Sequence, residues 1–278
     1  MKQRTVHQTR MLLAIFAALL LLLGLLLWQG IRRGDAVRVG IPHSASAYGA
    51  AMLLQAPSAQ YHCVLGSTPQ VLAKSLKAGD LDAALLPAEL ALELEECGIR
   101  AVLGYAPLVV VSANENIDSL QALSGSVVTV EKTLWDGPGE RMLRTLLDAA
   151  NVRCTLLPGS EGDPFVCTLD TAARQAAPIR FSLSRAWRDT LNTAPPAGLC
   201  LAVRQDYLAR AGADFSAFER ALRSAVAYGG DKRKKTVAMA ASAGLAVDVN
   251  AADALYPYCD FLWLTGAEME AALDAVGE

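Results

Sequence analysis

The sequence predicts an α/β protein with two lobes, preceded by an N-terminal membrane helix. Three observations predict it: an uncharged apolar run near the N-terminus, strands that alternate with helices from residue 37 onward, and a second block that repeats the alternation. The composition agrees, because 278 residues with 53% hydrophobic side chains can build a substantial core. With 25 Lys and Arg against 28 Asp and Glu, a general nucleic-acid binder is excluded, and we expect no nucleic-acid partner.

The membrane helix is predicted over residues 11–28, which begin at Met11, end at Trp28 and contain no charge. At about 1.5 Å per residue this run spans roughly 27 Å, close to the hydrocarbon thickness of a bilayer. The sequence after it has no Ala-x-Ala site and no cysteine for acylation, so an uncleaved anchor is favoured, and a cleaved signal peptide is the alternative. We expect the protein at the cell membrane, with the body on the extracytoplasmic side.

The alternation of elements after the anchor predicts the division into lobes. In the first block, strands are expected at residues 37–41, 61–65 and 83–86, and helices at 47–54 and 69–76. The second block has strands at 106–111, 127–130 and 199–203, and helices at 119–123 and 141–150. Helices at 215–226, 234–243 and 267–276 close the chain. This order predicts a parallel sheet with helices on both faces in each lobe.

Several segments in this order resemble a known family. They are GSTPQ at 66–70, LKAGDLDAALLP at 76–87, IDSLQALSGSVV at 117–128, DPFV at 163–166, VRQDYL at 203–208 and YPYCD at 256–260. Together they resemble the extracytoplasmic substrate-binding proteins of ABC importers, in the nitrate, sulfonate and thiamine-precursor (SsuA-like) group. The resemblance covers most of the chain after the anchor.

The resemblance implies the type II periplasmic-binding-protein fold. Residues 1–34 would be the anchor, 35–105 lobe one, 106–198 lobe two, and 199–278 the return to lobe one with the closing helices. Two crossings, near 104–107 and 195–199, would let the lobes close on a small solute, an anion or a small ring compound. The closed form would dock on an ABC permease and its ATPase. No bond is made or broken, so no enzyme activity and no cofactor are expected.

One departure from the family concerns lobe two. Family members usually place a second L-x-x-G-x-x-D-x-A helix and strand before the segment that matches DPF. Here only residues 158–162 separate Leu157 from Asp163. We therefore expect a shortened lobe two that lacks part of the usual ligand wall.

Ligand-binding residues are predicted where loops leave the carboxyl ends of strands, because open α/β sheets bind ligands there. Small hydroxyl groups and free backbone N–H groups in such loops suit a carboxylate, sulfonate or nitrate, and Tyr48 and Trp135 suit a flat ring. As ordinary structure, Ser44, Ser67 and Thr68 would be helix caps and Trp135 a core residue. The predicted set is His43, Ser44, Ser46, Tyr48, Ser67, Thr68, Pro87, Trp135, Asp136 and Gly137.

Neither the histidines nor the cysteines form a metal-binding motif. His43, His62 and Cys63 lack the ligand spacing of a structural zinc site, and we expect no metal. Six cysteines follow the anchor, an even number that is compatible with disulfides. We expect the pairs Cys63–Cys97, Cys154–Cys167 and Cys200–Cys259, with buried free thiols as the alternative.

Two other classes of protein compete with the solute-binding interpretation. One is a membrane-tethered sensor or assembly protein that kept the fold without transport, which the shortened lobe two favours. The other is an enzyme built on the same fold, which the membrane segment argues against.

Overall fold

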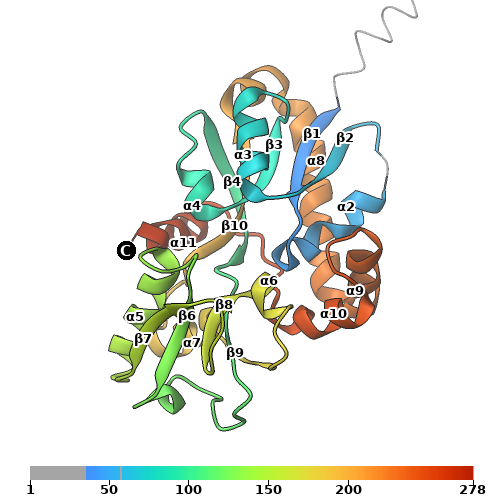
Figure 1. Ribbon diagram of the computed structural model, residues 1–278. Helices are drawn as coiled ribbons and strands as arrows, with labels where there is room; N and C mark the ends of the chain where they lie inside the picture. Colours follow the sequence, from blue (N-terminus) through green and yellow to red (C-terminus); the bar gives the residue numbers. More distant parts are fainter. Residues whose placement is uncertain (1–35, 57, 278) are drawn as a thin grey trace, which may run out of the picture. The chain divides into compact units, whose positions relative to one another are not determined.

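The computed structural model describes residues 36–56 and 58–277, and these form two lobes, each built on a five-stranded sheet (Figure 1). The predicted membrane segment, residues 11–28, lies outside the described residues. Among the described helices, none is long and apolar enough to cross a bilayer.

Lobe one contains a mixed sheet with the strand order β2-β1-β3-β10-β4. Its strands are β1 (Val37–Pro42), β2 (Tyr61–Gly66), β3 (Ala83–Pro87), β4 (Cys97–Tyr105) and β10 (Ala197–Arg204). Strands β1, β2 and β3 are parallel, as predicted, but β10 runs antiparallel to both β3 and β4. The prediction of a parallel sheet fails there because β10 returns from lobe two beside the end of β4, where Ala197 pairs with Tyr105.

The helices of lobe one are η1 (Ala45–Ala50), α2 (Ala51–Gln55), α3 (Pro69–Ala78) and α4 (Ala88–Leu92). The two helices predicted for lobe one are found, the first as η1 followed by α2 and the second as α3, whereas α4 was not predicted. The hydroxyl of Thr68 accepts the Val71 N–H at 3.3 Å to cap α3, and Pro69 stands at its first turn. Gly79 ends α3 with a φ of 82°, a left-handed conformation that glycine adopts without steric cost.

Lobe two repeats the strand arrangement in the order β7-β6-β8-β5-β9. Its strands are β5 (Leu108–Val111), β6 (Val127–Glu131), β7 (Thr155–Gly159), β8 (Phe165–Thr168) and β9 (Ile179–Ser182). Its helices are η2 (Gln121–Leu123), α5 (Pro138–Ala149), α6 (Leu169–Ala172) and α7 (Leu183–Leu191). Leu143 and Leu146 of α5 and Trp187 of α7 pack with Val128 and Val130 on one face of the sheet.

The connection from β7 to β8 contains no helix, although both strands run parallel to the β6 strand between them. A connection between two parallel strands of one sheet usually needs a dozen or more residues. Here residues 160–164 cross directly over the Thr129 side chain of β6. A Cβ atom on Gly159 or Gly162 would collide with that side chain, so glycine permits the short crossover.

Residues after β10 form the helices that close the chain. These are α8 (Gln205–Asp231), α9 (Arg233–Ser242), α10 (Val249–Leu255), η3 (Tyr256–Tyr258) and α11 (Ala267–Gly277). Helix α8 bends at Ala211, whose φ of −132° is not helical. Ala272 and Val276 of α11 pack in lobe one with α3 and α4, while Phe218 and Leu222 of α8 pack on the other face of the sheet. Helices therefore cover both faces of that sheet (Figure 1).

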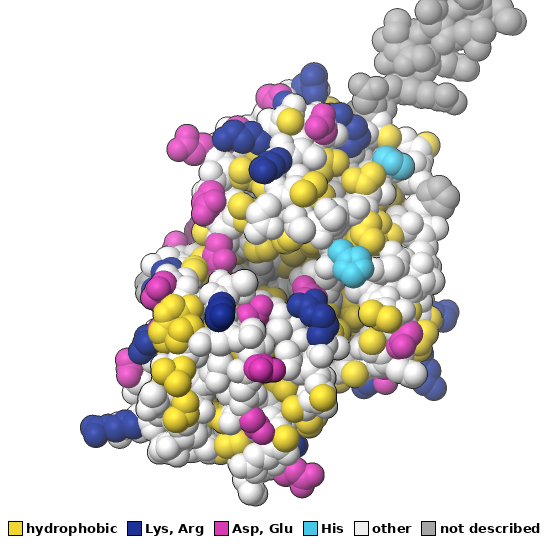
Figure 2. Space-filling view, in the orientation of Figure 1, with side chains coloured by type: hydrophobic (Ala, Val, Ile, Leu, Met, Phe, Trp, Pro, Cys, Tyr) yellow, Lys and Arg dark blue, Asp and Glu magenta, His cyan; other side chains and the backbone are white. Residues whose placement is uncertain are grey.

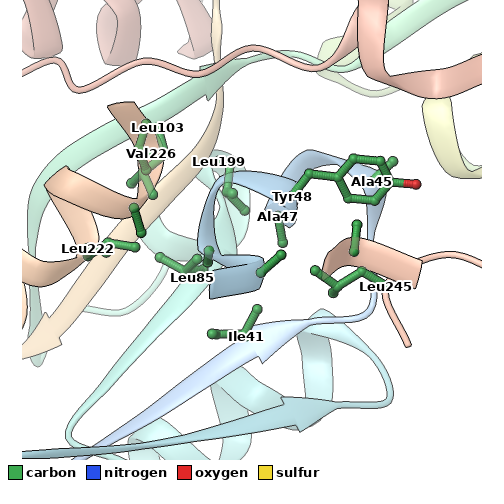
Figure 3. Packing of buried hydrophobic residues seen from close by; sticks show 14 of the residues in the cluster. Ile41, Ala45, Ala47, Tyr48, Leu85, Leu103, Leu199, Leu222, Val226 and Leu245 are labelled. Carbon is green, nitrogen blue, oxygen red and sulfur yellow. The ribbon is translucent and has the colours of Figure 1, made fainter. Parts of the chain in front are cut away.

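The largest hydrophobic cluster continues from one lobe into the other. Figure 3 shows its lobe-one part, where Ile41 and Leu85 of the sheet pack near Tyr48 and Val226. The same cluster includes Phe165 of β8, which is 1% exposed, together with other residues on that face of the lobe-two sheet. The lobes thus share buried apolar surface and not only a hinge.

Three hydrogen bonds also join lobe two to lobe one and its closing helices. The Asp170 carboxylate at the start of α6 accepts the Ala45 N–H at 2.8 Å. The Tyr258 hydroxyl donates to the Ile179 carbonyl at 3.1 Å, and the Arg141 guanidinium donates to the Val276 carbonyl at 3.2 Å. These three hydrogen bonds help to hold the boundary between the lobes, which we call the seam, together.

All six cysteines are free, so the predicted disulfides do not form. The physical reason is the same for each predicted pair, because a sheet separates its two thiols. Cys63, Cys167 and Cys259 belong to the cluster that both lobes share, whereas Cys97 and Cys200 pack with α3, α4 and α11, and Cys154 packs with α5. Burial raises the pKa of the Cys200 thiol to about 12, which favours the unreactive protonated form.

Candidate functional site: the cavity between the lobes

A cavity of about 260 Å³ lies between the two sheets, at the carboxyl ends of β1, β3 and β8. The space-filling view shows a hollow between the two halves of the molecule, with hydrophobic side chains inside it (Figure 2). Residues from both lobes line it. From lobe one they are Pro42, His43, Ser44, Ser46, Pro69, Pro87, Glu89 and residues 196–199, and from lobe two Leu134, Pro138, Gly139, Met142, Thr168 and Asp170. The end of α11 and the first crossing between the lobes complete the wall. This is the place where an open α/β sheet binds ligands.

Prolines form much of the cavity wall and make it rigid. The six that line it are Pro42, Pro69, Pro87, Pro107, Pro138 and Pro196. Proline has a fixed φ and no backbone N–H. Several strand ends and helix starts therefore face the cavity without the donor that an anion would use.

Four of the predicted ligand residues line this cavity, namely His43, Ser44, Ser46 and Pro87. The first three follow β1, and Pro87 ends β3, so both groups stand at the predicted strand ends. Ser44 also caps η1, because its hydroxyl oxygen accepts the Ser46 N–H at 3.3 Å. His43 is exposed at the cavity.

Tyr48 does not reach the cavity. Its side chain is 1% exposed and packs in the shared hydrophobic cluster with Ala45 and Ala47 (Figure 3). Its hydroxyl group has no hydrogen-bond partner among the described residues. Burial, with smaller contributions from Cys259 and Asp170, raises the pKa of this phenol well above its usual range. Tyr48 thus contributes packing beneath the cleft.

The other predicted residues lie beside the cavity and do not line it. Ser67 and Thr68 are exposed, and the cavity is lined by Pro69, the next residue. In lobe two, Leu134, Pro138 and Gly139 line the wall, whereas Trp135, Asp136 and Gly137 lie in the turn between them. Asp136 adopts a φ of 57°, and the Arg144 guanidinium lies 5.9 Å from the Trp135 ring. The correct turns were predicted, but which residue of each turn points inward was not.

Sequence reasoning missed the contribution of α6. Thr168, the last residue of the short strand β8, and Asp170 of α6 line the cavity from lobe two. The Thr168 hydroxyl caps α6 by accepting the Thr171 N–H at 3.3 Å, and Glu131 of β6 accepts the Thr168 N–H at 2.9 Å. A polar Thr-x-x-Thr segment after an apolar strand is the signal that could have found this helix start.

The helix starts around the cavity are already supplied with acceptors from the chain itself. Asp170 and Ser44 accept N–H groups of η1, Thr68 accepts one of α3, and Glu131 and Thr168 accept those at the start of α6. At α5, Pro138 has no N–H, and the Glu140 N–H donates to the Leu134 carbonyl at 3.3 Å. The chain's own carboxylate, hydroxyl and carbonyl oxygens therefore accept part of the N–H groups that an anion would use at these helix starts.

The cavity wall carries negative charge. Its ionisable side chains are His43, Glu89 and Asp170, and no Lys or Arg of the described residues lines it. Burial raises the pKa of the Glu89 carboxyl, an effect that Arg141 opposes and Glu93 strengthens. Arg141 lines a neighbouring cavity of about 220 Å³, where its guanidinium donates to the Val276 carbonyl.

Two sheets of matching strand order, joined by two crossings with a cavity between them, define the periplasmic-binding-protein fold. No family model matches the chain, and no curated protein matches it. Solved structures do resemble it.

An ABC transporter protein from Parabacteroides distasonis has a TM-score of 0.67 and 14% identity over 87% of this chain and 95% of that chain. The periplasmic aliphatic sulphonate-binding protein SsuA from Escherichia coli has a TM-score of 0.62 and 16% identity, covering 87% and 86% of the two chains. A ligand-binding component of an ABC-type import system from Staphylococcus aureus has a TM-score of 0.55 and 14% identity, covering 78% and 83%. These likenesses confirm the resemblance predicted from the sequence and establish the fold.

Proposed function

We propose that this protein is the membrane-anchored solute-binding component of an ABC importer. It captures a small solute between its lobes on the extracytoplasmic side of the membrane and delivers it to a permease with its ATPase. The cavity between the sheets carries this proposal, because it is rigid, mostly apolar and lined from both lobes. The similar structures include components of ABC import systems, which supports a binding role and not an enzymatic one.

The proposal is tested by thermal unfolding of the full-length chain in a nonionic detergent. The panel contains nitrate, alkanesulfonates, bicarbonate, aminopyrimidines, and small aromatic acids, alcohols and amines. A solute at 100 times its dissociation constant stabilises the native state by about 2.7 kcal/mol, which raises the melting temperature by several degrees. A stabilising solute that no longer acts on the Ala275→Trp variant, which fills the cavity, supports the proposal. A flat response across the panel from a well-folded protein contradicts it.

A membrane-tethered sensor or assembly protein is the second candidate, and one observation favours it. The largest hydrophobic cluster runs through both lobes, so separating the lobes would expose residues such as Phe165 and Leu169. An importer subunit changes its lobe separation when the solute binds, whereas a static assembly protein does not. Small-angle X-ray scattering with and without a stabilising solute separates the two. Neighbouring genes for an ATPase and a permease would favour import.

A further inference from the structure

The polarity of the cavity points to the chemical class of its solute. The wall supplies carboxylates from both lobes, Glu89 from lobe one and Asp170 from lobe two, and the remaining wall is mostly prolines and aliphatic side chains. Among the described residues the Glu89 carboxylate makes no side-chain hydrogen bond or ion pair, although Arg141 acts on it electrostatically and opposes the rise of its pKa. Glu89 also places negative charge in the first turn of α4, a helix start where no side chain acts as a cap.

Anionic solutes meet three obstacles here. No Lys or Arg of the described residues lines the wall, its prolines lack N–H donors, and the chain's own oxygen atoms accept part of the N–H groups at the starts of η1, α3 and α6. An anion would leave its charge uncompensated beside two carboxylates, which is costly in a partly buried site.

A solute with a positive charge meets the opposite conditions. A protonated amine supplies N–H donors and a charge that carboxylates bind by charge-assisted hydrogen bonds. Asp170 keeps one carboxylate oxygen on the Ala45 N–H, and its second oxygen has no hydrogen-bond partner among the described residues, so it can receive the amine without breaking the contact between the lobes. The apolar wall would cover the rest of the solute.

We propose that the cavity binds a small apolar organic cation, with its ammonium group on Glu89 and Asp170 and its hydrocarbon part against the proline-lined wall. This inference rests on the proposed function, since it names the solute class of the same cavity. It departs from the anionic solute that the sequence suggested.

The test compares three molecules with one apolar body and different charge: phenethylamine, 2-phenylethanol and 3-phenylpropionate. Each is titrated into the full-length chain in a nonionic detergent, and binding is followed by isothermal titration calorimetry and thermal unfolding. We expect phenethylamine to bind best. Glu89→Gln should weaken it about tenfold or more, because a hydrogen bond to a charged group is lost. Asp170→Asn should weaken it in the same direction while keeping an acceptor for the Ala45 N–H.

Glu95→Gln is the matched control, since Glu95 is an exposed acid shortly after α4 and does not line the cavity. It should bind phenethylamine like the parent chain. Equal or tighter binding of the alcohol or the carboxylate would overturn the cation inference and leave the proposed function intact. Equal loss in Glu89→Gln and Glu95→Gln would also overturn it. If none of the three molecules binds, and the broad panel is flat as well, the proposed function fails together with the inference.

Discussion

The two lobes solve the same topological problem in different ways. In both, the chain must pass from one side of a parallel strand to its other side, which gives the matching orders β2-β1-β3 and β7-β6-β8. Lobe one makes this crossing with the ten-residue helix α3, and lobe two makes it with residues 160–164 alone. In each lobe the strand before the crossing ends in glycine, at Gly66 and at Gly159.

These two glycines leave room for different neighbours. A Cβ atom on Gly66 would collide with Leu72 of α3, and one on Gly159 would collide with Thr129 of β6. In lobe one, helix α3 lies against the end of β2. In lobe two, residues 160–164 pass over the sheet without forming a helix. The comparison shows that the same strand order forms without a crossover helix when the backbone of the connection can approach the sheet closely. Both lobes leave large apolar side chains exposed, such as Val71 of α3 at 47% and Leu157 of β7 at 49%, so the absence of the helix does not by itself expose apolar surface.

The largest effect is expected from the helical crossover. Leu72 is 3% exposed and packs α3 against the sheet, so Leu72→Ala should cost about 2–5 kcal/mol of unfolding free energy. Thr129→Ala under the short crossover removes no comparable buried apolar contact and should cost far less. Urea unfolding of the two variants measures both values. Equal losses would contradict the view that only lobe one depends on a packed crossover helix.

The next effect concerns the close approach in lobe two. Gly159→Ala should destabilise the protein by about 1–3 kcal/mol, because the new methyl group collides with the Thr129 methyl group. Gly98→Ala in β4 is the matched control, since a Cβ atom there meets nothing within 4 Å. Combining Gly159→Ala with Thr129→Ala should restore most of the loss. A double variant as unstable as the sum of the single variants would show that the collision is not the cause.

A smaller effect is expected where the lobes touch. Asp170→Ala removes the acceptor for the Ala45 N–H and should cost about 0.5–2 kcal/mol, the usual range for a lost helix-start cap. Asp170→Asn retains a carbonyl oxygen and should cost much less. Differential scanning calorimetry of both variants measures the difference. Identical melting temperatures for Asp170→Ala and the parent chain would argue that this contact does not hold the seam.

The smallest effect is a pH dependence. Burial raises the pKa of Glu89 above its value in an unfolded chain, so its contribution to stability is present at acid pH and is lost as the pH rises through the folded pKa. Glu89→Gln should therefore gain stability relative to the parent chain between about pH 4 and pH 7, by only about half a kcal/mol, because the carboxyl is partly buried and Arg141 opposes the shift. A difference that is constant with pH would contradict the shift.

Local signals made much of lobe one predictable. The Thr68 cap and Pro69 predicted the start of α3, and the apolar runs predicted β1, β2 and β3 closely. The antiparallel direction of β10 was not predictable from its own residues, because it is set by where the chain returns from lobe two. Strands β4, β7, β8 and β9 were not predicted. All residues of β9 are half-buried, so it lacks the apolar run that marks a buried strand.

The site was predictable only in part. The expectation that ligands bind at the carboxyl ends of strands correctly located His43, Ser44, Ser46 and Pro87 at the cavity, because those turns continue directly from buried strands. It failed for Tyr48, since a short helix turned that side chain into the core. The role of Asp170 depends on how two lobes meet, which no local pattern encodes.

The central claim is that the cavity between the lobes holds a small solute. The most direct measurement equilibrates the full-length chain with a small-molecule extract, removes unbound molecules, and identifies what is retained by native mass spectrometry. Ala275→Trp, which fills the cavity, is compared with Asp274→Trp on the adjacent position of α11, which does not line it. We predict one molecule at about one per chain on the parent and on Asp274→Trp, and none on Ala275→Trp. Retention by Ala275→Trp equal to that of the parent, or no molecule retained by either, would contradict the claim.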